Sequence, residues 1–212
     1  HFRLSYDGDR EELLSGGYDL VLQTLEDGYA EYAGLFGVRL AEGGAPAIEV
    51  VLLERGEFDD LTGLGHWAGG AYDGRIRVPV TDLGTEQQRL VRVLRHELVH
   101  AFVQEAGGHG VAGWLNEGLA EFLEEPAGAA RAAAIERSRE KVSATAMRSL
   151  KELSGSLSSF GSVDEIRAAY AQSVSFVAWI EHWYGERVLF QMVEGCRDGA
   201  KVGDTFKERT GV

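Results

Sequence analysis

The stretch Arg95-His96-Glu97-Leu98-Val99-His100 lies near the middle of the 212-residue chain, and the rest of the sequence is interpreted from it. Apolar residues recur around it at three- and four-residue spacing, which predicts an amphipathic helix that begins at a capping box on Thr85 and ends at Gly107. Four residues make about one helical turn, so His96 and His100 project from the same face. In this His-Glu-x-x-His pattern two imidazoles bind one zinc ion and the glutamate acts as a base.

A second stretch, Trp114-Leu115-Asn116-Glu117-Gly118-Leu119-Ala120-Glu121, offers a third ligand. A hydrolytic zinc site has three protein ligands and one open position for water. Glu117 follows His100 by 17 residues (117 minus 100), which leaves room for a helix end, a glycine-rich turn and a second helix. We therefore predict a single zinc ion held by His96, His100 and Glu117. Glu97 is the expected general base, which takes a proton from the attacking water and passes it to the leaving nitrogen.

The second predicted helix carries a stripe of carboxylates, formed by Glu117, Glu121 and Glu124 at four- and three-residue spacing. Such a stripe is usually a solvated face, whereas a nearby cation would offset the repulsion among three like charges. Glu121 lies one turn beyond the predicted ligand, so it is a candidate to accept a hydrogen bond from the far nitrogen of a ligand histidine. The sequence leaves both interpretations of Glu121 open.

Composition limits the class of protein. A hydrophobic content of 44% and a charged content of 26% are typical of a globular domain. The net charge of −13 argues against a nucleic acid or an anionic membrane as partner, and no apolar run is long enough for membrane insertion. The single cysteine, Cys196, excludes an internal disulfide and a cysteine-based zinc cluster. The sequence begins at His1 rather than Met; if a signal peptide has been removed, we expect an extracytoplasmic protein, and compartment and oligomeric state stay open.

The pattern along the chain predicts an α+β fold. A small N-terminal mixed sheet with a helix precedes the helix of the two histidines, and the C-terminal half is helical throughout. We expect a single catalytic domain over residues 1–212, with a sheet-rich lobe at 1–84 and a helical lobe at 85–212. The strands are expected at residues 2–6, 48–53, 67–72 and 75–80. The helices outside the zinc motifs are expected at residues 13–36, 57–64, 127–141, 162–185, 188–193 and 204–209.

The two zinc motifs together resemble those of the gluzincin metallopeptidases. They are most similar to the peptidase MA-like domain related to the aminopeptidase-N group and, more remotely, to thermolysin. Further pieces are similar to that domain in the same order, at residues 2–7, 70–76, 169–173 and 184–185, so the resemblance spans nearly the whole chain. It implies a zincin-like fold and a zinc metallopeptidase that acts on a peptide or protein, with His96, His100 and Glu117 as ligands and Glu97 as the base.

The match to aminopeptidase N is incomplete in two respects. The spacing from His100 to Glu117 is shorter, and no Gly-x-Met-Glu-Asn segment is present to bind a free amino group, so an endopeptidase-like or unassigned activity is the stronger expectation. The aminopeptidase-N group uses a tyrosine from a later helix to stabilise the oxyanion, and Tyr170 occupies a similar place in the order. Tyr170 fits equally well as a core aromatic, and His109 is a weaker alternative.

Two other functions stay open from the sequence. One is a non-catalytic zinc-binding or scaffolding module that keeps the peptidase fold, against which the intact Glu97 argues. The other is a zinc amidase that acts on a non-peptide amide.

If the strand expected at 67–72 lies at a sheet edge beside the zinc, an extended peptide could pair with it, and Gly69 and Gly70 would allow a close approach. The loop at 154–162 is interpreted as a mobile lid or, more simply, a connector.

Overall fold

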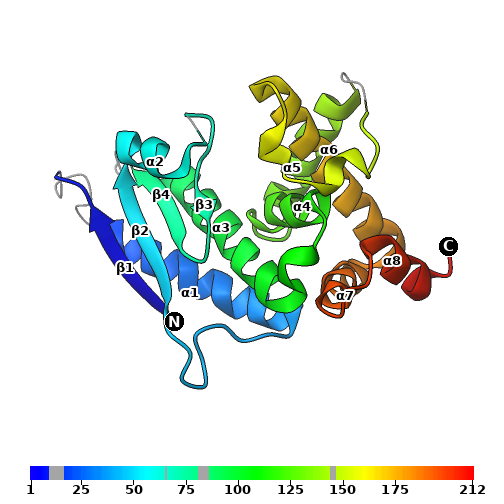
Figure 1. Ribbon diagram of the computed structural model, residues 1–212, viewed down its shortest axis with the longest axis horizontal. Coiled ribbons are helices and arrows are strands. Elements are labelled where there is room, and N and C mark those ends of the chain that lie inside the picture. The colour runs from blue at the N-terminus through cyan, green and yellow to red at the C-terminus, as the bar shows by residue number, and fades with distance from the viewer. Residues whose placement is uncertain (10–16, 65, 81–85, 144–146) are drawn as a thin grey trace. The chain divides into compact units, whose positions relative to one another are not determined.

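The computed structural model describes residues 1–9, 17–64, 66–80, 86–143 and 147–212 of the chain (Figure 1). These residues fall into two compact units, His1–Phe102 and Val103–Val212, each of which is described by itself. The described part is α+β, with a small sheet followed by helices, as the sequence predicts. The helix start predicted at Thr85 and the first residues of the helix expected at 13–36 lie outside the described residues. Among the described helices, none is long and apolar enough to cross a membrane.

The sheet of the first unit is mixed and has the strand order β1-β2-β4-β3. Strands β1 (Phe2–Asp7), β2 (Ile48–Glu54) and β4 (Ile76–Val80) run parallel, whereas β3 (Ala71–Tyr72) pairs antiparallel with β4. The register places Val50 of β2 opposite Ile76 of β4, and both side chains are fully buried. The central strands therefore form the core of this unit, and β3 forms one edge of the described sheet.

β3 is shorter than the strand predicted at residues 67–72. The first part of the predicted strand does not pair with another strand. Trp67 and Ala68 instead pack in an apolar cluster around Leu53 and Phe58. Phe58 belongs to α2 (Arg55–Thr62), which directly follows β2. The free energy of burying these apolar side chains outweighs a few strand hydrogen bonds at an edge, so the strand prediction was wrong for residues 67–70.

Helix α1 (Gly17–Phe36) packs against α3 (Gln87–Gly107), the helix that carries the first motif (Figure 1). The ring of Phe102 on α3 contacts three rings of α1, with centroids 5.4 Å from Tyr29, 5.9 Å from Tyr32 and 5.8 Å from Phe36. Aromatic groups at these separations add stabilisation beyond the area that they bury. Helix α3 ends at Gly107, as predicted.

One charged contact also joins these two helices. The buried Arg95, next to His96 on α3, places its guanidinium 2.7 Å from the carboxylate of Glu31 and 5.1 Å from the ring centroid of Tyr32. Charge-assisted hydrogen bonds are stronger than neutral ones, and a buried arginine requires such a partner. The first motif is therefore fixed against α1 from both its apolar and its charged side.

The second unit is helical. Its central helix is α6 (Val163–Tyr184), which contacts α4 (Gly113–Leu123), α5 (Ala129–Ser143) and α7 (Glu186–Arg197). The remaining elements are α8 (Val202–Thr210) and the short 3₁₀ turns η2 (Gly108–Gly110), η3 (Glu152–Ser154) and η4 (Leu157–Ser159). The predicted capping box is present, because the Ser162 hydroxyl accepts a hydrogen bond from the Glu165 amide. Gly185, with φ of 84°, ends α6 as predicted.

Candidate metal centre

The first half of the candidate site is a single turn of α3. His96 and His100 lie on the same face of the helix, with ring centroids 4.9 Å apart and planes at 82°, and both are half-buried. Glu97, between them in sequence, is only 5% exposed. A buried carboxylate in a helix is uncommon unless it has a role or a partner, since an ionised group loses hydration there.

The side chain of Glu97 lies against the main chain that leads into β3. A Cβ added to Gly70 would stand 2.7 Å from Glu97 Oε1 and 2.8 Å from Val93 Cγ1, and one added to Gly69 would stand 2.9 Å from Val93 Cγ2. These approaches are closer than real Cβ contacts, so a residue other than glycine would have to displace the Glu97 or Val93 side chain. Gly70 therefore brings this edge of the sheet against the predicted base, and Gly69 brings it against Val93.

The second half of the candidate site lies on α4. Its apolar residues Trp114, Leu115 and Leu119 are buried, whereas Glu117, Glu121 and Glu124 are half-buried. Gly118 permits a close approach to α6, because a Cβ there would stand 2.8 Å from the main-chain oxygen of Ser173. Helix α4 therefore buries its apolar side and presents a row of carboxylates on another.

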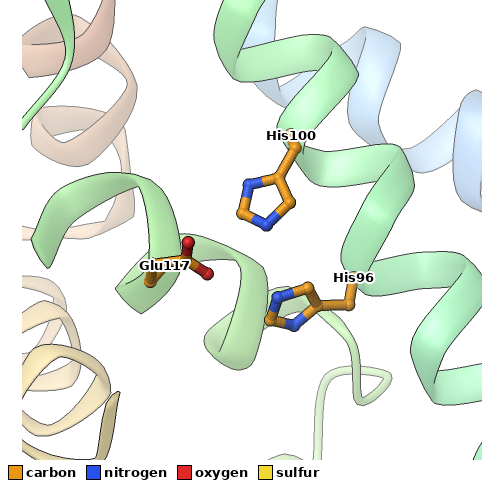
Figure 2. A group of neighbouring side chains, drawn as sticks. All are labelled: His96, His100 and Glu117. Atoms are coloured by element: carbon orange, nitrogen blue, oxygen red, sulfur yellow. The ribbon is translucent and has the colours of Figure 1, made fainter. Parts of the chain in front are cut away.

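The predicted ligand atoms come together in the structure. One nitrogen from each of His96 and His100 and one oxygen from Glu117 lie within 4.8 Å of one another (Figure 2). Figure 2 shows both imidazoles projecting from one helix towards the Glu117 carboxylate on another. Two imidazole nitrogens and one carboxylate oxygen are the donor set of a catalytic zinc site, so the residues fit this ion by their chemistry.

His96 also belongs to a second group. One of its nitrogens and one carboxylate oxygen from each of Glu121 and Glu124 lie within 4.8 Å of one another. This places Glu121 within reach of the histidine that we expect it to orient, and its role stays a prediction. Glu124 had no individual role among the sequence predictions, although its three-residue spacing from Glu121 on the helix was the available signal.

Three other residues were singled out from the sequence. Tyr170 is half-buried on α6, and its assignment as an oxyanion donor stays a prediction. His109 is exposed in η2. Cys196 is buried in α7, where its thiol donates to the Met192 carbonyl at 3.3 Å, and burial raises the pKa of this thiol. In the described part of the chain, Cys196 contributes to no metal-binding group.

A helix with two histidines and a buried glutamate, followed by a helix whose Glu117 carboxylate lies near both imidazoles, is the arrangement of a metallopeptidase-like protein of the gluzincin type. A family model of the peptidase MA superfamily matches residues 63–212, and the chain belongs to this superfamily. The match covers 150 residues (212 minus 62) and includes both motif helices. Comparison with curated proteins and with solved structures finds no match.

Proposed function

We propose that this protein is a zinc-dependent metallopeptidase that hydrolyses peptide bonds in a peptide or protein. The observation that carries the proposal is the clustering of His96, His100 and Glu117 beside the buried Glu97. Membership of the peptidase MA superfamily supports the same reaction class. The site residues thus combine three ligands of suitable chemistry with one carboxylate in the place of a general base.

Each side chain then has a distinct task. His96, His100 and Glu117 hold the ion, and Glu121 orients the His96 ring through the nitrogen that does not bind metal. Zinc, when bound, supplies Lewis-acid chemistry that lowers the pKa of water to about 7. Glu97 takes the proton from the attacking water and delivers it to the amide nitrogen that leaves. Burial of Glu97 suits this proton transfer, because bulk water competes less for the carboxylate.

The edge of the sheet is the proposed place for the substrate main chain. β3 is at one end of the described strand order, and Gly70 directly before it contacts Glu97. An extended peptide laid along this segment would form main-chain hydrogen bonds with it and bring a carbonyl near the base. Main-chain pairing of this kind suits cleavage within a peptide rather than at a free amino group.

The proposal is tested with purified wild-type protein, Glu97→Gln and a control, Glu105→Gln. Glu105 lies on the same helix as Glu97, and its side chain is 52% exposed, so its substitution removes one carboxylate without touching the site. The assays are zinc content and hydrolysis of a mixed peptide pool followed by mass spectrometry. We expect Glu97→Gln to bind zinc and lose about 10²–10⁴-fold in rate, with Glu105→Gln unchanged.

Three outcomes would contradict the proposal. Absence of zinc from the wild-type protein would refute the metal assignment. Zinc binding with no hydrolysis, or with equal hydrolysis by Glu97→Gln, would favour a non-catalytic zinc-binding or scaffolding module. Cleavage of a non-peptide amide but of no peptide would favour a zinc amidase. Tyr170→Phe would then be assayed on that amide, to test Tyr170 as the predicted oxyanion donor.

A further inference from the structure

Residues 147–160 form a segment that we call the strap, because it is fixed to two helices of the second unit. Two of its side chains are fully buried anchors, Leu153 at 0% and Leu157 at 1% exposed. Within the strap, the Ser149 hydroxyl and amide donate to the Glu152 carboxylate at 2.6 and 2.8 Å. A segment with buried leucines and internal hydrogen bonds is an ordered connector, which argues against the mobile-lid interpretation.

Gln172 on α6 clamps the start of the strap. Its amide nitrogen donates to the Arg148 carbonyl at 2.6 Å, and its amide oxygen accepts from the Arg148 N–H at 2.9 Å. Gln172 is only 8% exposed, so both hydrogen bonds form where water competes poorly. The Arg148 guanidinium adds a 2.7 Å contact with Glu165 of α6 and lies 4.2 Å from the Phe160 ring centroid. The strap is thereby attached to α6 through both main chain and side chain.

The strap also contacts α4, at Gly113, the first residue of that helix. A methyl group on Gly113 would overlap the main-chain oxygen of Gly155 and stand 3.1 Å from the main-chain oxygen of Leu153. These are backbone atoms, which cannot rotate away as a side chain can. Residues four apart in a helix lie on the same face, so the strap touches α4 one turn before Glu117, on the face of Glu117.

Helix α4 is also held on its other side by α6. Gly118, the residue after Glu117, contacts the Ser173 main chain, and the Trp114 ring has its centroid 4.9 Å from that of Phe176. The turn that carries Glu117 is therefore fixed between two surfaces, and Gln172 joins those surfaces to each other. Resting on the proposed function, we infer that the strap and Gln172 are positioning elements that set the metal affinity by holding Glu117 in place.

Two variants weaken the attachment of the strap, one at α4 and one at α6, and one matched control leaves both contacts intact. Gly113→Ala forces α4 and the strap apart, and Gln172→Leu removes both hydrogen bonds of the clamp. Gly155→Ala places the same methyl group on the other partner of the contact, where nothing lies within 4 Å. Circular dichroism of the metal-free proteins reports whether each variant folds, and Gln172→Leu keeps the test decisive should Gly113→Ala fail to fold.

The readout is the zinc dissociation constant, measured by competition with a chromophoric chelator, together with limited proteolysis of residues 147–160. We expect both releasing variants to bind zinc at least about tenfold more weakly while remaining folded, because partners that orient metal ligands have effects of this size. Both should be cleaved faster within the strap, and Gly155→Ala should match the wild type in every assay.

The inference and the proposed function fail in different ways. Wild-type affinity for zinc in a folded Gln172→Leu protein whose strap is cleaved faster would overturn the positioning role and leave the peptidase proposal standing. A wild-type protein that binds no zinc would overturn both. Ile180→Val, a fully buried change on α6 eight residues beyond Gln172 (180 minus 172), controls for general destabilisation. A loss of zinc affinity in that variant equal to that of Gln172→Leu would also overturn the inference.

Discussion

Replacement of Gly118 by alanine tests the close approach of α4 and α6. The new methyl group would stand 2.7 Å from Val177 Cγ2 and 2.8 Å from the Ser173 main-chain oxygen. Carbon atoms in contact normally lie about 3.5–4.0 Å apart, so one of the helices must move. Val177 is fully buried and cannot rotate into solvent, and the Ser173 oxygen belongs to a helix backbone.

The size of the effect follows from two opposing terms. Overpacking of this kind destabilises by about 1–3 kcal/mol, whereas alanine is favoured over glycine inside a helix by about 1 kcal/mol. Because the obstacle includes backbone, we expect the upper part of the range and a net loss of about 1–2 kcal/mol in the free energy of unfolding. At a typical urea dependence of about 2 kcal/mol per molar, the midpoint would fall by about 0.5–1 M.

The measurement is urea denaturation of metal-free protein followed by circular dichroism. Gly203→Ala is the control, because Gly203 is also in a helix of the second unit, with nothing within 4 Å of an added Cβ. This control should be as stable as the wild type or more stable by up to about 1 kcal/mol. If Gly118→Ala is as stable as Gly203→Ala, the helices do not approach as closely as the structure has them.

Three further predictions concern other sites. Gly70→Ala should reduce peptide hydrolysis about 10–100-fold at nearly unchanged zinc content, because its methyl group would displace Glu97; an unaltered rate would contradict the contact. The Cys196 thiol, whose pKa burial raises, should react with an aromatic disulfide at neutral pH only after urea unfolds the protein, and rapid native labelling would disprove its burial. Glu31→Gln should lower the free energy of unfolding by about 1–2 kcal/mol, because the buried Arg95 loses its charged partner. Urea denaturation of the variant and the wild type at low and high salt measures this difference, and equal stability would contradict it.

The parts of the fold that the sequence predicted are those set by local patterns. The helix of the first motif, the capping box at Ser162 and the stop at Gly185 follow from the spacing of apolar residues and the chemistry of caps, which act within a few residues. The mixed sheet was also predicted, because β-branched runs identify its central strands. The strand at 67–72 was overestimated, since Trp67 gains more from packing than from pairing at an edge.

The parts of the site that the sequence missed depend on contacts between distant segments. Gly70 and Glu97 are 27 residues apart (97 minus 70), and no local pattern reveals that one touches the other. Gln172 entered the sequence analysis only within residues 169–173, which resemble the family, because a glutamine on a helix usually faces water. The available signal was that Gln172 lies in a stretch of this helix, residues 168–180, that has no charged residue.

The described sheet has β3 at one edge and β1 at the opposite edge. All six residues of β1 pair with β2, which lies on one side of it. Sheet edges of this length invite a strand from another molecule, and like charge between molecules is one means of preventing it. At neutral pH the charge of −13 keeps copies of the chain apart. Near the isoelectric point of about 4.9 that repulsion disappears, so mild acid is the condition in which pairing of β1 with a second molecule is least opposed.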